Sequence, residues 1–426
     1  MQKDVKMTEL FEFLKKSKTA FHAIDNIAAV LRSEGYERLY ENEEWTLSEG
    51  GKYYVIRGGS SIVAFRNMGG GFMIAASHSD SPCFRIKGDA VSAGCLKLET
   101  ERYGGMINYT WLDRPLTVSG RVTVRTDSGV AAMLADIGDR KLVIPSLAIH
   151  LNRGVNDGAS FNPATELLPL AAIGTERGVI RKMIAESLGV SAEDIISDEL
   201  YLTAADEPTL CGLGGELILS PRLDDLACAY ASLKGFLSAD DSTATPVLAV
   251  FDNEEVGSQT KQGAASTLLY DTLYRISGDS TEYLKRVASS FLVSADNAHA
   301  MHPNRPEMSD RNNAPVLGGG IVLKHNANQR YITDGVSEAV FTAICTDAGV
   351  KLQSYYNRAD LPGGSTLGSI ANTQVSLPGV DIGLPQLAMH SACECCAAAD
   401  VESMITALRA FFGKAVEIKG EEIDIK

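Results

Sequence analysis

The 426-residue sequence lacks an uninterrupted apolar run long enough to span a bilayer, and its mean hydropathy is −0.01. A transmembrane helix needs about 20 consecutive apolar residues. The first segment, MQKDVKMTELFEFLKK, alternates charged and apolar side chains and lacks the apolar core of a signal peptide. We therefore expect a cytoplasmic protein that makes no membrane contact.

The chain also lacks the two separate C-x-x-C pairs of a thiolate zinc ribbon, although it has eight cysteines. Without an export signal, most of these thiols are expected to be reduced and buried. The run Cys393-Glu394-Cys395-Cys396 could be read as a metal-binding group. We favour the plainer interpretation, in which these small side chains pack within a helix predicted for about 392–416.

Positive charge is scarce: 39 Lys and Arg residues stand against 54 Asp and Glu residues, which gives a formal net charge of −15. A field of that sign repels phosphate backbones and anionic lipid, so nucleic acid and membranes are not expected partners. The length and a hydrophobic content of 45% favour two domains with a large buried core.

The pattern of apolar residues predicts helices in the first 35 residues and a hairpin of strands at 52–57 and 61–66. The continuous apolar run at 71–77 is typical of a strand buried on both faces. Alternating strands such as 116–125 indicate an inserted domain. After residue 220, further segments alternate between helix and strand, with helices at 223–238, 264–277 and 392–416 and strands at 245–251, 290–295 and 380–384.

This order predicts an α/β fold: a mixed, mostly parallel sheet flanked by helices, with an inserted β-rich second domain. We assign residues 1–90 and 220–426 to one discontinuous domain. Residues 91–219 form the insertion.

Acidic and imidazole side chains follow the predicted strands at their carboxyl ends, where functional residues of such sheets collect. Each alone has a plainer explanation, such as a structural histidine, a carboxylate at a helix N-terminus or a solvated pair. Together they would concentrate negative charge that two divalent cations could neutralise. The residues are His78, Asp80, Asp224, Glu254, Glu255, Asp296 and His390.

The adjacent glutamates Glu254 and Glu255 suit a two-metal hydrolase, because one carboxylate can hold a cation while its neighbour carries a proton. Nitrogen and oxygen ligands without thiolate suit catalytic zinc, with manganese or cobalt as alternatives.

Several longer motifs match those of a known protein family. The chain is similar to the aspartyl aminopeptidases, a branch of the dinuclear-zinc aminopeptidases, from about residue 75 to 395. The matching blocks are SHSDSPCFRIK (77–87), YGGMINYTWLDRPL (103–116), LAIHLNR (147–153), SPRLDDL (220–226), DNEEVGS (252–258), DNAHAMHPN (296–304), NQRY (328–331) and LPQLAMHSACE (384–394).

The resemblance implies a metallo-aminopeptidase that removes the N-terminal residue of peptides, with two divalent ions per subunit. His78, Asp224 and Asp296 would hold one ion. Asp224 would bridge to the second ion, which Glu255 and His390 would complete. The discontinuous domain would then be catalytic, and the insertion would serve oligomerisation.

It also implies that Glu254 is the general base and that Asp80 hydrogen-bonds the His78 ring to fix its tautomer. Members of this family form homo-oligomers, usually dodecamers. His150 matches a family histidine that projects into a neighbouring subunit's active site.

The substrate preference is less determined. Eukaryotic members have KQRY where this chain has NQRY, and the missing lysine helps them bind an acidic side chain. Lys324 and Arg330 are alternative cations, and Gly363 and Gly364 belong to a loop expected to line the substrate site. We predict a preference for N-terminal Asp or Glu, with neutral aliphatic residues as the competing hypothesis.

Two other functions remain open at this point. One is a related two-metal carboxypeptidase or deacylase, which usually carries a different dimerisation domain. The other is a metal-free, oligomeric binding protein. We interpret His299 and His302 as supporting or structural residues, because the ligand set implied by the resemblance is already complete.

Overall fold

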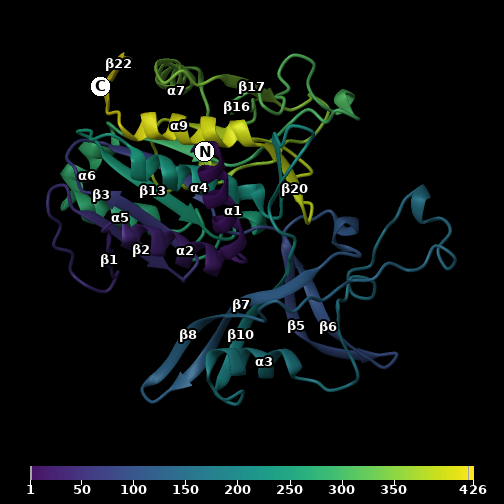
Figure 1. Ribbon diagram of the computed structural model, residues 1–426. Helices are drawn as coiled ribbons and strands as arrows, with labels where there is room; N and C mark the ends of the chain where they lie inside the picture. Colours follow the sequence, from purple (N-terminus) through teal and green to yellow (C-terminus); the bar gives the residue numbers. More distant parts are fainter. Residues whose placement is uncertain (1, 421) are drawn as a thin grey trace.

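The computed structural model describes residues 2–420 and 422–426, and its largest element is a nine-stranded mixed sheet (Figure 1). In spatial order, its strands are β1 (Glu37–Leu39), β2 (Lys52–Arg57), β3 (Ser61–Arg66), β13 (Thr245–Phe251), β4 (Phe72–His78), β14 (Phe291–Ala295), β18 (Gly379–Gly383), β16 (Ile321–His325) and β17 (Leu352–Tyr356). The central strands β13, β4, β14 and β18 run parallel, whereas β3 and β16 pair antiparallel with this set. The continuous apolar run of β4 is fully buried, as predicted, and β13 and β14 are fully buried as well.

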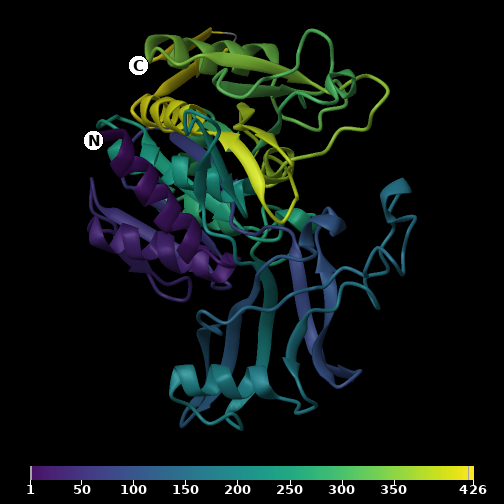
Figure 2. The ribbon, with the colours of Figure 1, turned by 45° about the vertical axis from the view of Figure 1, so that its right-hand side comes forward.

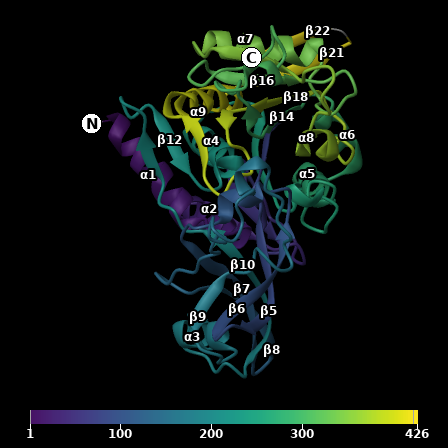
Figure 3. The same ribbon diagram turned by 90° about the vertical axis from the view of Figure 1, so that its right-hand side faces the viewer.

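Helices cover both faces of this sheet (Figure 3). One face carries α1 (Gln2–Lys16), α2 (Ala20–Ser33), α4 (Leu223–Ser238), α7 (Gly335–Asp347) and α9 (Ala398–Phe412). The other carries α5 (Leu268–Ser277), α6 (Ser280–Val287) and α8 (Leu367–Ala371). Successive residues of β4 enter opposite cores, because strand side chains alternate between faces: Met73 packs with the first helix set and Ile74 with the second. The predicted fold class is confirmed.

A six-stranded antiparallel sheet forms a second body below the first (Figure 1). Its spatial order is β8 (Gly129–Asp136), β7 (Leu116–Thr126), β10 (Ile195–Ala204), β5 (Cys83–Ser92), β6 (Cys95–Tyr103) and β9 (Leu170–Ile173), with α3 (Val179–Leu188) packed against it. The chain passes between the two sheets after His78, so residue 90, the predicted end of the first domain segment, falls inside β5.

Residues 142–144 bridge to β7, to β9 and to Leu112, but the segment that follows, residues 145–166, forms no strand of this sheet and projects from the body of the molecule (Figures 1 and 2). We call it the projecting arm. It contains the short helix η2 (Val155–Asp157).

A five-stranded sheet corrects one prediction. Its order is β11 (Thr209–Cys211), β12 (Leu217–Ser220), β20 (Glu394–Ala397), β19 (Pro385–Leu387) and β15 (Ala298–His299). The helix predicted for 392–416 is therefore wrong at both ends, since 394–397 form a strand and α9 begins at Ala398 and ends at Phe412. Pairing with β12 and β19 stabilises the extended conformation, so tertiary contacts override local propensity. The helix predicted at 264–277 likewise begins later, at Leu268.

The remaining elements are short. They are η1 (Asn108–Trp111), η3 (Glu254–Val256), η4 (Pro306–Met308) and the C-terminal hairpin of β21 (Val416–Lys419) and β22 (Glu422–Ile425).

Among the described residues, no helix combines the length and the apolar character needed to cross a membrane.

Candidate metal centre

Seven side chains that the sequence places after strands or at a helix start come together at one edge of the nine-stranded sheet. His78 ends β4, Asp296 follows β14, and Glu254 begins η3 just beyond β13. Because β13, β4 and β14 are parallel neighbours, their carboxyl ends meet at this edge. Asp224 arrives from the start of α4, and His390 from the loop after β19.

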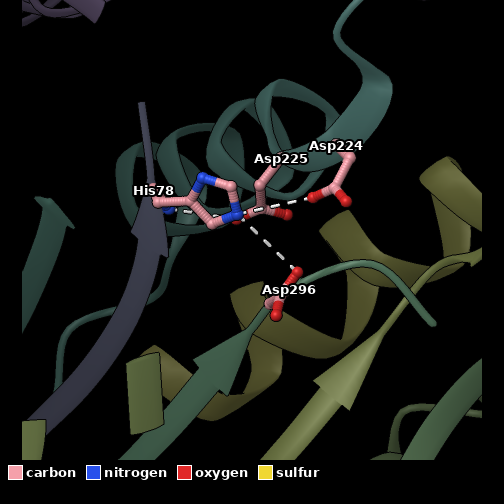
Figure 4. A group of neighbouring side chains, drawn as sticks. All are labelled: His78, Asp224, Asp225 and Asp296. Atoms are coloured by element: carbon pink, nitrogen blue, oxygen red, sulfur yellow. Dashed lines mark hydrogen bonds and ion pairs between the residues drawn. The ribbon is translucent and has the colours of Figure 1, made fainter. Parts of the chain in front are cut away.

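The first group surrounds the Nε2 atom of His78 (Figure 4). This nitrogen lies 3.4 Å from Asp224 Oδ1 and 3.8 Å from Asp296 Oδ1. The neighbouring Asp225 accepts a hydrogen bond from the backbone N–H of His78, at 3.0 Å. All four side chains are buried, so the group is a preformed pocket of nitrogen and oxygen atoms.

The second group surrounds the Nε2 atom of His390, which lies 3.5 Å from Asp224 Oδ2 and 3.4 Å from Glu255 Oε2. Asp224 therefore presents one carboxylate oxygen to each imidazole. Glu254 joins the same region, since ligand atoms of His78, Glu254 and Glu255 lie within 4.8 Å of one another. The two groups share Asp224 and are contiguous.

These residues fit divalent cations. Within the described part of the chain, Asp224 Oδ1 and Asp225 Oδ1 are buried without a hydrogen-bond partner. Burying several carboxylates this close together is costly, and a cation coordinated by nitrogen and oxygen would reduce that cost. The donor set contains no thiolate and suits zinc, manganese or cobalt.

The pKa values show how closely the charges are packed. Burial, together with the nearby Asp296 carboxylate, raises the pKa of Glu254 to about 7. Burial and the Asp224 carboxylate raise the pKa of Glu255 well above its usual value. Burial opposes protonation of His78, but the surrounding carboxylates, Asp225 first, raise its pKa well above the usual value. A bound cation would take the place of these shared protons, so metal binding should release protons.

Asp80 hydrogen-bonds with residues of both groups. The Nδ1 atom of His78 hydrogen-bonds with the backbone oxygen of Asp80, at 3.1 Å, while the Asp80 carboxylate lies 3.4 Å away. The expected contact with the ring is therefore made chiefly through the backbone. The carboxylate instead accepts the backbone N–H groups of Glu254 and Glu255, each at 3.1 Å. Asp80 thus holds the two-glutamate turn beside His78.

Three groups outside the predicted set of site residues hold His390, Asp224 and Asp80. The carboxylate of Glu394 accepts the backbone N–H of His390, at 2.7 Å, and that of Asp224, at 3.0 Å. The backbone oxygen of Gly105 accepts a hydrogen bond from His390 Nδ1, which leaves Nε2 free to face the carboxylates. Tyr103 donates to Asp80. Only the presence of Glu394 in the block that contains His390 could have indicated its role.

A cavity of about 140 Å³ opens beside the two groups. Besides the candidate ligands, it is lined mainly by polar side chains: His299, Lys324, Tyr331, Tyr355, Ser365 and Thr366. Gly364 lines it, whereas Gly363 and Arg330 are not among its described lining residues. The buried ammonium of Lys324 lies 3.5 Å from Asp296 Oδ2 and is therefore partly engaged by the metal centre.

His150 is not part of this site in its own chain. It lies exposed on the projecting arm.

Comparisons with known proteins agree with this geometry. A model of the family described as aminopeptidase I zinc metalloprotease (M18) matches residues 13–412. The chain belongs to the M18 aminopeptidase family. A probable M18 family aminopeptidase 2 of Clostridium novyi is 42% identical to this M18 aminopeptidase over 410 residues, covering 92% of this chain and 95% of the relative. The predicted resemblance is confirmed.

Solved structures give the same result. The chain matched in the cryo-EM structure of the Ape4 and Nbr1 complex has a TM-score of 0.91 at 35% identity, covering 95% of this chain and 85% of that one. The mApe1 dodecamer of S. cerevisiae has a TM-score of 0.84 at 26% identity, covering 96% of this chain and 97% of that one. This M18 member is thus a metallo-aminopeptidase, a hydrolase, by family.

Proposed function

We propose that this M18 aminopeptidase holds two zinc ions and removes acidic residues from peptide N-termini. The observation that carries the two-ion proposal is the placement of Asp224, whose two carboxylate oxygens face different imidazoles. His78, Asp224 and Asp296 would hold one ion. Asp224, Glu255 and His390 would hold the other. When bound, the ions would polarise the scissile carbonyl and acidify the attacking water.

Glu254 is proposed as the proton carrier. Its carboxylate is close to His78 and Glu255, and its backbone N–H is fixed by Asp80. A carboxylate at this position can accept a proton from a nearby water and return it. Glu254 would take the proton of the attacking water at a carboxylate oxygen and deliver it to the leaving amine.

The polar cavity supports the acidic preference over the aliphatic one. Burial opposes the charge of Lys324, but Asp296 and its other neighbours raise its pKa, so the ammonium stays charged. Hydroxyl groups of Tyr331, Tyr355 and Thr366 share the lining. A cation with surrounding hydroxyl groups favours a carboxylate, whereas an aliphatic side chain would meet a polar lining.

We further propose a homo-oligomeric enzyme, a dodecamer like the S. cerevisiae mApe1 relative, with the insertion as its oligomerisation domain. The projecting arm supports this, since Leu147, Ile149 and Leu151 are 59%, 48% and 74% exposed there. In such an assembly, His150 would reach the active site of a neighbouring subunit. A cytoplasmic location and the absence of nucleic-acid partners, expected from the sequence, belong to the same proposal.

A panel of aminoacyl p-nitroanilides tests the substrate preference. With zinc-loaded enzyme, we expect kcat/KM for Asp and Glu to exceed that for Leu by about tenfold or more, which corresponds to about 1.4 kcal/mol of differential binding. Faster cleavage of the Leu substrate would overturn the acidic preference. Efficient cleavage of N-acetylated peptides would instead favour the deacylase or carboxypeptidase alternative, because neither requires a free α-amine.

A further inference from the structure

The inserted domain contacts the catalytic turn directly through Tyr103, the last residue of β6. The Tyr103 hydroxyl donates a 2.7 Å hydrogen bond to Asp80 Oδ2. The same hydroxyl accepts a 2.8 Å hydrogen bond from Asn253 Nδ2. One oxygen atom therefore connects the six-stranded sheet to two residues that surround the two-glutamate turn.

The Tyr103 hydroxyl is protonated and can therefore donate this hydrogen bond. Burial, reinforced by the Asp80 and Asp252 carboxylates, raises the pKa of Tyr103, so it keeps its proton at physiological pH. Asn253 has a left-handed backbone, with φ of 62°, and its side-chain oxygen accepts hydrogen bonds from Thr260 and Gln262. Its amide group is thereby oriented with Nδ2 toward Tyr103.

The backbone after Tyr103 also approaches the turn closely. Gly104 has φ of +74°, and a Cβ atom at this position would lie 3.1 Å from Glu255 Cβ. A side chain at residue 104 would therefore crowd Glu255 and strain the backbone. The insertion thus packs against the turn as well as hydrogen-bonding to it.

We propose that Tyr103 is a positioning residue, by which the inserted domain holds the Asn253–Glu255 turn against Asp80. This proposal rests on the proposed roles of Glu254 and Glu255. Asp80 accepts three of the hydrogen bonds involved: two from the turn and one from Tyr103. Without the hydroxyl, Asn253 Nδ2 loses its acceptor, and the turn can shift away from the metal centre. The insertion would then serve the catalytic centre of its own chain, in addition to assembly.

The test is Tyr103→Phe, which keeps the ring and removes the oxygen atom. We expect kcat to fall about 10- to 100-fold, because a shift of about 1 Å in a catalytic group has an effect of that size. KM should change by less than about twofold, since Tyr103 is not among the described residues that line the cavity. Zinc affinity, measured by competition with a chromogenic chelator, should fall about tenfold or more.

Tyr201→Phe is the matched control. Tyr201 lies on β10, its ring packs edge-on against Tyr103 at 5.8 Å, and its hydroxyl accepts from Arg85 rather than contacting Asp80. It should retain kcat and zinc affinity within about twofold. Thermal melts of the metal-free variants check that both fold.

A double-mutant cycle with Asn253→Gly gives a second measurement, since glycine accepts the left-handed backbone without the side-chain donor. If Tyr103 acts through this contact, the double variant should be no worse than the worse single variant. Additive losses, or a Tyr103→Phe variant with kcat and zinc affinity within twofold of wild type, would overturn the proposal. A wild-type enzyme without peptidase activity would refute the proposed function instead, and the zinc measurements would still test Tyr103.

Discussion

At the catalytic edge of the nine-stranded sheet, the Asp224 side chain is 4% exposed, whereas Leu151 on the projecting arm is 74% exposed. The edge is built from residues whose polar atoms meet groups of the same chain: His390, for example, is held by Glu394 and Gly105. The arm instead presents apolar side chains to solvent. Apolar surface of this kind is typical of an interface. The candidate metal ligands therefore all come from one chain, whereas the arm presents a surface that suits a partner.

Glu254→Gln should have the largest effect of the variants described here, and this effect should be confined to the catalytic edge. Glutamine preserves the shape of the side chain but cannot accept a proton, so kcat should fall about 10³-fold. Zinc content and oligomer mass, measured by metal analysis and light scattering, should match wild type, because the arm is untouched.

The exposed Glu193→Gln on the insertion serves as the control and should keep full activity. Activity of Glu254→Gln near the wild-type rate would show that another group carries the proton.

Leu151→Asp acts on the arm alone and should have the next largest effect. A charge in an apolar contact carries a desolvation cost, so the assembly should dissociate into smaller species during sedimentation. Activity should fall by about tenfold or more if His150 completes a neighbouring site, while bound zinc per subunit stays constant.

Leu284→Asp is a matched control, because Leu284 is 66% exposed on α6, at the opposite side of the molecule from the arm (Figure 1). It should leave the oligomer mass unchanged. If Leu151→Asp also retains its wild-type mass and activity, the arm is not the interface proposed here.

The same contrast explains how much could be predicted from the sequence. The residues at the catalytic edge could be predicted from the sequence, because an apolar run such as the one before His78 indicates a buried strand and shows where it ends. The strand at 394–397 was not, because it depends on pairing with a segment about 180 residues away. Gly105 contributes only a backbone oxygen, which has no sequence pattern. Tyr103 begins one of the matching motifs, but the motif does not indicate that its hydroxyl bonds to Asp80, 23 positions earlier.

The smallest effect is expected at the contact, here called the seam, between the body built on the nine-stranded sheet and the body built on the six-stranded sheet. Lys18, which follows α1, forms an ion pair there with Asp136 of β8, at 3.0 Å. His22 of α2 lies near this pair and hydrogen-bonds with Thr19. Burial lowers the pKa of His22 from 6.5 to about 4. The unfolded chain therefore binds a proton between pH 6.5 and pH 4 that the folded chain does not, and stability is lost as the pH falls through this window.

His22→Gln should remove this pH dependence, because glutamine can keep the hydrogen bond to Thr19 but does not titrate. Between pH 6.5 and pH 4, urea denaturation should show the variant losing less stability than wild type, by on the order of 2 kcal/mol. Activity at neutral pH should be unchanged, since the imidazole is uncharged there. His302→Gln, at an exposed histidine, controls for the loss of an imidazole elsewhere. If wild type, His22→Gln and His302→Gln instead lose equal stability on acidification, protonation of His22 does not destabilise the fold, and the acid sensitivity arises at the carboxylate-rich edge.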